Sequence, residues 1–167
     1  MKTAIYPGSF DPVTYGHIDI IERASQIVDK LVIGVLFNSS KTALFSVEER
    51  VKMLKEVTKH LPNVEVTDFS GMLVDFAEAN DARIIVRGLR AVSDFEYEKQ
   101  WAQANRSLKP QLDTIFLVTN AQYSYISSSA VRELTRFKCD TSLFVPPFVE
   151  QMLLDKIKME DAKNEQN

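Results

Sequence analysis

The sequence predicts a single doubly wound α/β domain, in which a five-stranded parallel sheet carries helices on both faces. Three observations lead to this prediction. Short apolar runs rich in β-branched residues alternate with longer segments of helical period. A length of 167 residues suits one domain, and no internal repeat or low-complexity linker divides the sequence. We therefore expect residues 1–158 to form one domain, followed by a frayed polar tail over residues 159–167.

Five apolar runs are the expected strands. Each is short, is rich in Val, Ile, Phe or Thr, and is followed by turn-forming or polar residues. Near-continuous apolar character, as in LVIGVLF, is typical of parallel strands that are buried on both faces. The five runs cover residues 3–6, 30–37, 64–69, 83–88 and 114–119.

The segments between these runs have apolar residues at helical spacing. In the first, this face extends from Ile18 to Val28. The second opens with Ser46 followed three residues later by Glu49, which is the spacing of a capping box. The remaining helices are expected over residues 72–81, 94–108 and 128–137, with a last helix after residues 146–147.

Charge and cysteine content argue against several classes of protein. Twenty Lys and Arg against 23 Asp and Glu leave a formal net charge of −3, so nucleic acid is not an expected partner. The apolar runs are shorter than the ~20 residues of a membrane-spanning helix, so a membrane is not expected either. The single cysteine, Cys139, cannot form an internal disulfide, which favours a reducing compartment and predicts a cytoplasmic protein.

The unusual residues of the sequence follow the expected strands. In a doubly wound sheet, ligands bind beyond the carboxyl ends of the strands, where the strand order reverses. We therefore expect five loops to converge on one edge of the sheet: residues 8–17, 38–41, 71–73, 87–90 and 123–129.

The loop after the first strand opens a helix with Thr14-Tyr15-Gly16-His17. The five glycines include no pair spaced G-x-G, and no GxxxxGK[ST] motif is present, so the usual dinucleotide and P-loop cradles are excluded. The free N–H groups and the dipole of a helix N-terminus favour an anion. We predict that Thr14 is the N-cap and that His17 is neutral and donates one N–H, because the helix end disfavours an imidazolium.

Four segments carry a resemblance to a known family: YPGSFDPVTYGHIDII, SKTALFSVEERV, VRGLRAVSDFEYE and YSYISSSAVRE. In this order and spacing, the chain resembles the nucleotidylyltransferases with an (H/T)xGH motif and, within them, the bacterial phosphopantetheine adenylyltransferase family. The TxGH motif alone is weak, but the four segments together are specific and span nearly the whole chain. Ser9 stands where the family more usually has Thr, and Tyr123 stands where Trp is common.

The resemblance implies a reaction. ATP and 4′-phosphopantetheine would give dephospho-coenzyme A and pyrophosphate, with Mg2+ assisting. The nucleophile would be the phosphate of the acceptor, which is already ionised at neutral pH, so no general base and no covalent enzyme intermediate are required. The resemblance also implies a homo-oligomer, in the form of a hexamer.

The resemblance further implies roles for individual residues. His17 would contact the α-phosphate and the transition state, and Lys41 and Arg87 would bind the acceptor phosphate. Leu73 would border the pantetheine arm, and Ser9 would lie between the two substrates. No side chain is assigned as a metal ligand. The implied ATP site consists of Ser9, Phe10, His17, Gly88, Leu89, Arg90, Glu98, Tyr123, Ser124, Tyr125, Ile126, Ser127, Ser128 and Ser129.

Several of these residues also have a purely structural interpretation. Arg87 and Arg90 could pair with the acidic residues of segment 94–98 in surface ion pairs worth at most about 1 kcal/mol. The serines at 127–129 could do no more than cap a helix. Three aromatic residues at helical spacing favour core packing or subunit contact over base stacking: Phe95, Tyr97 and Trp101.

Two other functions stay open at this point. One is another nucleotidylyltransferase of the same superfamily, which would use CTP or a different acceptor such as nicotinate mononucleotide. The other is a regulatory domain that binds ATP or coenzyme A without turnover. The acidic balance disfavours a nucleic-acid module.

Overall fold

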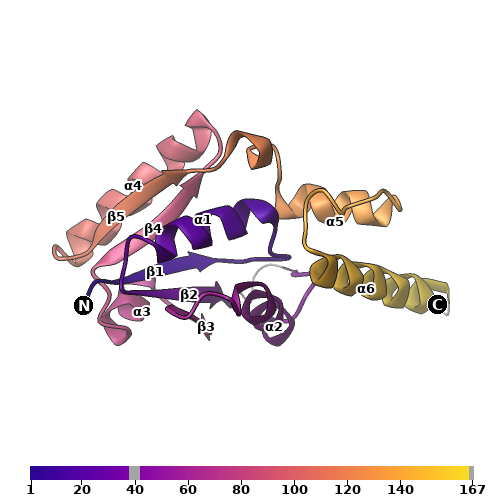
Figure 1. Cartoon of the computed structure of the whole chain (residues 1–167), viewed down its shortest axis with the longest axis horizontal. Helices are drawn as coiled ribbons and strands as arrows, with labels where there is room; N and C mark the ends of the chain where they lie inside the picture. Colours follow the sequence, from indigo (N-terminus) through magenta and orange to yellow (C-terminus); the bar gives the residue numbers. More distant parts are fainter. Residues whose placement is uncertain (38–41, 166–167) are drawn as a thin grey trace.

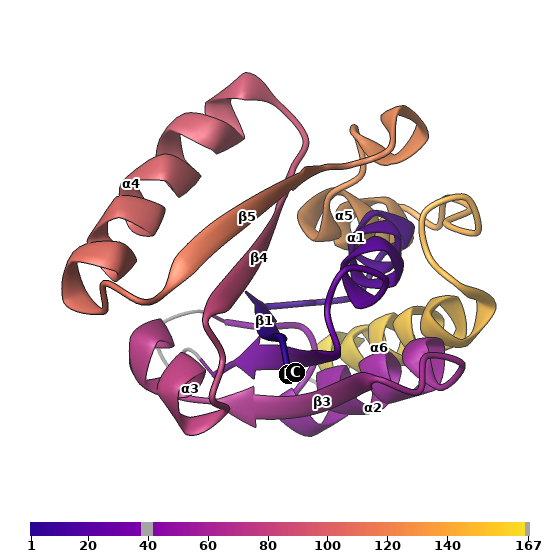
Figure 2. The same ribbon diagram turned by 60° about the vertical axis from the view of Figure 1, so that its left-hand side comes forward.

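The computed structural model describes residues 1–37 and 42–165. Its strands form one parallel sheet in the order β3-β2-β1-β4-β5, so the strand order reverses between β1 and β4. The sheet has helices on both faces (Figure 2), which confirms the predicted fold class. The strands are β1 (Thr3–Gly8), β2 (Lys30–Leu36), β3 (Val64–Phe69), β4 (Ile84–Leu89) and β5 (Asp113–Val118).

Helices connect the strands and follow the last of them along the chain (Figure 1). The expected capping box of the second helix forms, because Ser46 N–H donates to Glu49 and Glu49 N–H donates to the Ser46 hydroxyl. The elements are α1 (Tyr15–Ser25), α2 (Val47–Thr58), α3 (Leu73–Ala79), α4 (Val92–Leu108), the short 3-10 helix η1 (Ala121–Tyr123), α5 (Ser128–Arg136) and α6 (Pro147–Glu165). None of the helices in the described part of the chain has the length and apolarity needed to cross a membrane.

Two helix boundaries lie three or more residues from the expected ones. α1 ends at Ser25, so Val28 lies beyond the helix, although its side chain is buried. α6 continues to Glu165 and includes most of the segment that was expected to fray after Lys158. Residues 159–165 include Met, Ala, Lys and two Glu but neither Gly nor Pro, so the local propensities allow the helix to continue.

Alternate side chains of β1 face two different hydrophobic cores. Tyr6 belongs to the larger core, together with Ile20 of α1 and Leu153 of α6. Ile5 belongs to the smaller core, together with Phe76 of α3. α3 and α4 lie on one face of the sheet and α1 and α2 on the other (Figure 2). Because side chains on both faces of the strand are buried, nearly every position has to be apolar, which explains the nearly continuous apolar runs in the sequence.

Gly34 in β2 lies directly under an aromatic pair. Phe69 and Phe76 stack with their ring centroids 4.2 Å apart, and a Cβ at Gly34 would meet the ring of Phe76 at 2.5 Å. We expect Gly34→Ala to lower the free energy of unfolding by about 1–3 kcal/mol, because a packed core accommodates an added methyl only by displacing the ring. Urea unfolding measures this loss, and an unchanged midpoint would mean that the ring pair moves aside freely.

α4 contributes little to the core of this chain. Asn105 is its one buried residue, whereas Phe95, Tyr97 and Trp101 are 41, 60 and 54% exposed. Core packing of these three aromatic residues, one of the two predicted alternatives, is therefore wrong. One face of α4 packs against β4 and β5. The opposite face of α4 has no partner in the described part of the chain (Figure 2).

Candidate active site

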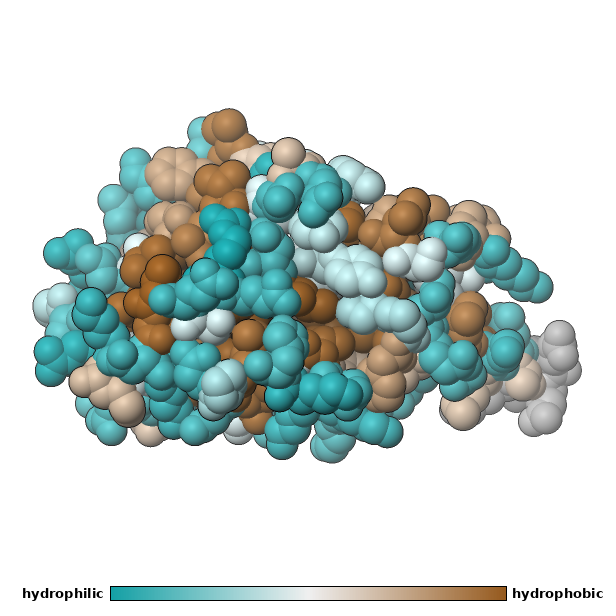
Figure 3. Space-filling view, viewed as in Figure 1, coloured by the Kyte–Doolittle hydropathy of each residue, from teal (hydrophilic) through white to brown (hydrophobic). Residues whose placement is uncertain are grey.

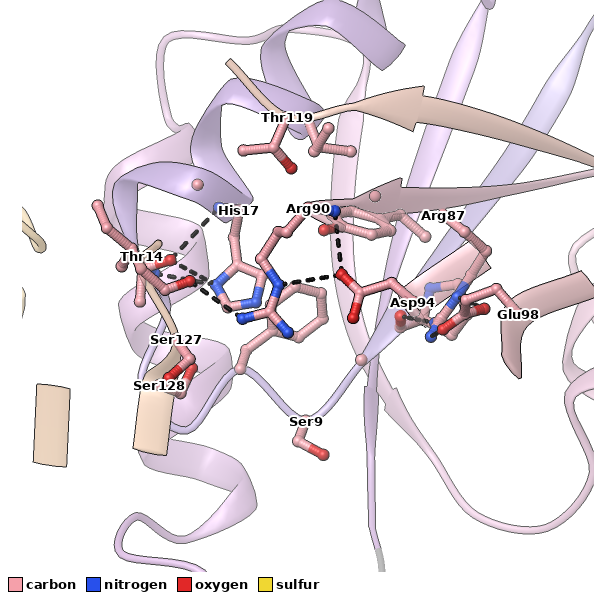
Figure 4. Close-up of a pocket in the computed structure, with 18 of the residues that line it drawn as sticks. Ser9, Thr14, His17, Arg87, Arg90, Asp94, Glu98, Thr119, Ser127 and Ser128 are labelled. Carbon is pink, nitrogen blue, oxygen red and sulfur yellow. Dashed lines mark hydrogen bonds and ion pairs between the residues drawn. The ribbon is translucent and has the colours of Figure 1, made fainter. Parts of the chain in front are cut away.

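A cleft of about 770 Å³ opens at the carboxyl ends of β1 and β4, where the strand order reverses. Its walls come from the β1–α1 loop, the end of β4, the first turns of α4, and the N-terminus of α5. Figure 4 shows Thr14 and His17 on one side of this space and Arg87 and Glu98 on the other. The position is the one expected for ligand binding in a doubly wound sheet.

His17 is the third residue of α1, and its side chain completes a capping box with Thr14. The main-chain N–H of Thr14 donates to Nδ1 of His17 at 3.0 Å, and the Thr14 hydroxyl lies 3.1 Å from the same nitrogen. Because Nδ1 accepts a hydrogen bond, the neutral ring carries its proton on Nε2. The edge-to-face contact with Phe10, at 5.1 Å between ring centroids, supports the ring from one side. His17 can thus donate from Nε2 without changing its protonation state.

The imidazole of His17 is neutral at physiological pH. Burial lowers the pKa of His17 to about 4, and the positive charges of Arg90 and Arg87 act in the same direction. This confirms the predicted neutral form. The causes are burial and the two arginines, which meet His17 only in the folded chain, whereas the sequence pointed to the helix N-terminus.

The lowered pKa of His17 predicts how stability depends on pH. Between about pH 6.5 and pH 4 the unfolded chain binds a proton at this position and the folded chain does not, so stability falls as the pH falls. We expect His17→Gln to remove this contribution, about 1.4 kcal/mol per pH unit in that window. Urea unfolding of both proteins at several pH values measures it, and parallel profiles would contradict the assignment.

Two arginines face the cleft, and each is paired with a carboxylate of α4. Arg87 at the end of β4 forms a two-pronged ion pair with Glu98, which outweighs the effect of burial and raises the pKa of Arg87. Arg90 lies 3.4 Å from Asp94 and donates to the carbonyl of Ile126 at 3.2 Å. The ion pairs considered from the sequence are present. Both arginines also line the cleft, so the purely structural interpretation of Arg87 and Arg90 as ion-pair partners is incomplete.

The N-terminus of α5 forms another wall of the cleft. Ser127 is its N-cap and accepts the N–H of Ala130 at 3.1 Å, as the sequence allowed. Ser128 donates to the carbonyl of Pro12 at 2.7 Å, which ties α5 to the β1–α1 loop. The hydroxyl of Ser129 lies 3.2 Å from that of Ser127. Neither α1 nor α5 has an acidic residue in its first turn, so both helix ends favour an anion.

The loop that carries Ser9 is fixed to the chain that precedes α2. Asp11 is buried, and its carboxylate accepts the N–H groups of Leu44 and Phe45, both at 2.9 Å. Arg50 of α2 is buried too, and it donates to the carbonyl of Ser9 at 2.7 Å. Asp11 and Arg50 therefore hold the β1–α1 loop in place, and neither side chain lines the cleft.

Most of the residues implied by the family resemblance meet in this cleft. Leu73 instead packs against the smaller core. Tyr123 does not line the cleft but stacks on Tyr15. Leu89, Ser124 and Tyr125 do not line the cleft either, and Lys41 lies outside the described residues. The residues that do line it are Ser9, Phe10, His17, Arg87, Gly88, Arg90, Glu98, Ile126, Ser127, Ser128 and Ser129.

The cleft also contains residues that the sequence analysis did not assign to it. Tyr6 is only 6% exposed, and burial raises the pKa of its hydroxyl well above the ordinary value. Thr119 follows β5, and the rule that sites lie at carboxyl strand ends would have identified it. Tyr97 lines the cleft although its helical spacing pointed to packing. No local signal separates Tyr6 from an ordinary residue of a buried strand.

Comparison with known proteins agrees with this geometry. A family model described as cytidylyltransferase-like matches residues 5–134. A phosphopantetheine adenylyltransferase of Caldanaerobacter subterraneus subsp. tengcongensis is 54% identical over 95% of this chain and 99% of its own length. Another, of Lachnoclostridium phytofermentans, is 56% identical over 93% of this chain and 96% of its own length. This chain belongs to the phosphopantetheine adenylyltransferase family.

Solved structures of more distant proteins share the fold of this phosphopantetheine adenylyltransferase family member. A Vibrio parahaemolyticus protein assigned as a nicotinate-nucleotide adenylyltransferase aligns with a TM-score of 0.71 and 19% identity, over 94% of this chain and 95% of the other. The nicotinic acid mononucleotide adenylyltransferase of Plasmodium falciparum aligns with a TM-score of 0.70 and 15% identity, over 93% of this chain and 96% of the other. At these identities the likeness supports the fold alone.

Proposed function

We propose that this protein transfers the adenylyl group of ATP to 4′-phosphopantetheine, giving dephospho-coenzyme A and pyrophosphate. The observation that carries the proposal is a neutral His17 whose Nε2–H can donate into a cleft with two arginines and two helix N-termini. Such a site suits two phosphate-bearing substrates. The high identity to curated phosphopantetheine adenylyltransferases supports this acceptor over others.

The chemistry requires positioning and charge stabilisation. The phosphate of the acceptor attacks the α-phosphate of ATP in line, and pyrophosphate leaves from the opposite side, so no nucleophilic side chain takes part. His17 would stabilise the charge that grows on the α-phosphate, with Arg90 and the N-terminus of α5 on the β- and γ-phosphates. Arg87 would bind the acceptor phosphate. On the resemblance alone, Lys41 would join Arg87 at the acceptor phosphate. Leu73, which lies outside the cleft, would border the pantetheine arm.

ATP would enter as its Mg2+ complex. Within residues 1–37 and 42–165, no group of three His, Cys, Asp or Glu side chains is arranged to hold a metal ion. Mg2+ commonly keeps several waters and binds through substrate phosphates. Its ligands would then be mainly phosphate oxygens, where it would offset the charge of the leaving pyrophosphate. The protein's own part would be to bind those phosphates at α5.

The same proposal includes assembly and location. Exposed apolar side chains gather over α4 and β5 (Figure 3), and a patch of this kind marks an interaction surface. We propose a homo-oligomer in which α4 contacts a second copy, with the hexamer as its specific form, in the cytoplasm. Light scattering of wild type and Trp101→Glu measures the assembly. The apolar residues of the patch are Val92, Phe95, Tyr97, Trp101, Leu108 and Val118.

Pyrophosphate release tests the proposed reaction. We expect release from MgATP with 4′-phosphopantetheine, and no comparable release when CTP replaces ATP or nicotinate mononucleotide replaces the acceptor. Release with one of the replacements instead would favour another nucleotidylyltransferase. Tight ATP binding by the folded protein without any release would favour the sensor.

A further inference from the structure

Tyr6 of β1 has a buried side chain whose hydroxyl forms no hydrogen bond within residues 1–37 and 42–165. The residue is only 6% exposed, and its ring meets Phe10 edge to face with 5.4 Å between the ring centroids. In the described part of the chain, no side-chain nitrogen or oxygen is sealed from solvent without a partner. The hydroxyl of Tyr6 therefore opens onto the cleft that this residue lines.

The hydroxyl of Tyr6 lies on the face of the sheet that carries α1. Tyr6 shares the larger core with Ile20 of α1, and its hydroxyl is 3.7 Å from the position that a Cβ would take at Gly88. Successive side chains of a strand alternate between the two faces, so Arg87 points to the other face. Figure 4 shows Arg87 across the cleft from His17. The free hydroxyl thus opens into the half of the cleft that is bounded by α1.

The chemistry of this hydroxyl is that of a neutral donor. Burial raises the pKa of Tyr6 and outweighs the opposite effect of Arg87, so the hydroxyl keeps its proton at physiological pH. It can donate one hydrogen bond to a sugar or phosphate oxygen. Leaving a buried hydroxyl unpaired is costly, so a ligand that displaces water from this half of the cleft has to supply an acceptor.

We propose that the hydroxyl of Tyr6 donates a hydrogen bond to an oxygen of the ribose or the α-phosphate of ATP, which makes Tyr6 a further nucleotide-binding residue of the cleft. The inference rests on the proposed function, in which ATP occupies the half of the cleft with His17 and Gly88. It deepens that function by assigning a neutral donor to the nucleotide beside the charged groups. The acceptor, on the side of Arg87, would not touch this hydroxyl.

The substitution Tyr6→Phe tests the inference, because it removes only the hydroxyl and keeps the ring that contacts Phe10. Calorimetry with MgATP gives the dissociation constant, and pyrophosphate release gives KM for each substrate. We expect the dissociation constant of ATP to rise about three- to tenfold, the usual net worth of one neutral hydrogen bond. The KM for 4′-phosphopantetheine should not change. Urea unfolding without ligand should not change either, because the hydroxyl has no partner among the described residues.

The matched control is Tyr15→Phe, which removes the same hydroxyl from a half-buried tyrosine that does not line the cleft. Titrations with 2′-deoxy-ATP and 3′-deoxy-ATP separate the two acceptor oxygens, because an analogue without the bonded hydroxyl abolishes the difference between wild type and Tyr6→Phe. A difference that persists with both analogues places the bond at the phosphate.

Three results would overturn the inference. They are unchanged ATP binding in Tyr6→Phe, a raised KM for 4′-phosphopantetheine with unchanged ATP binding, and a loss of stability in the absence of ligand, which would mean that the hydroxyl bonds within the protein. Wild type that binds ATP without releasing pyrophosphate would overturn the proposed reaction instead, and calorimetry with MgATP would still test Tyr6.

Discussion

Replacing His17 with alanine is expected to lower kcat for adenylyl transfer by on the order of 10²–10³, the usual cost of one lost donor to a developing charge. The dissociation constant of ATP should change much less, because Arg90 and the N-terminus of α5 remain. The physical reason is the orientation of the ring, which Thr14 holds through Nδ1 so that Nε2–H is free to donate. Steady-state pyrophosphate release and calorimetry measure the two quantities.

The second histidine of the chain is the matched control for this prediction. The side chain of His60 is 54% exposed, lies 3.2 Å from Glu22 and does not line the cleft. His60→Ala should therefore keep full activity. A His17→Ala protein that is folded and loses less than about tenfold in kcat would contradict a role in stabilising the transition state.

Replacing Asp11 with alanine is expected to have the largest effect on stability. Its carboxylate accepts two buried N–H groups, those of Leu44 and Phe45, and lies 3.6 Å from Arg132. Without it, both N–H groups and the cation lose a partner, which typically costs about 3–5 kcal/mol. We expect a fall in melting temperature of roughly 10 °C, measured by calorimetry.

The chemistry of Asp11 can be separated from a general effect of removing a carboxylate. Asp11→Asn keeps one acceptor oxygen and should lose less stability than Asp11→Ala. Asp155→Ala removes an exposed carboxylate of α6 and should stay within about 0.5 kcal/mol of wild type. Similar losses for Asp11→Ala and Asp155→Ala would mean that the contacts of Asp11 add nothing specific.

The fold followed from local patterns because each pattern has a direct physical cause. Parallel strands buried on both faces must be apolar throughout, and the capping box at Ser46 satisfies free N–H groups at the start of α2 whatever surrounds it. Boundaries were less predictable. Val28 continues the apolar spacing of α1 yet lies beyond its end at Ser25, since burial and helical conformation are separate properties.

The candidate site was predictable where its residues lie in motifs and at strand ends. Thr14 and His17 were found in this way, and so was Ser127 as a cap. Tyr6 was not, because within a buried strand a tyrosine gives no local signal. Tyr97 was expected to pack, because helical spacing shows which residues share a face but not what that face meets.

By itself, the sequence determined the order of the strands and helices along the chain, the N-cap Thr14 of the helix that carries His17, and the family, because these depend on residues close together in the chain or on whole segments. Only the tertiary structure decided the protonation of His17, the pairing of Arg87 with Glu98 and the exposure of α4. The charges near His17 come from residues more than 60 positions away, and a pKa depends on distance and burial in the folded chain. In the same way, which of the acidic residues in α4 meets Arg87 depends on how α4 packs against β4.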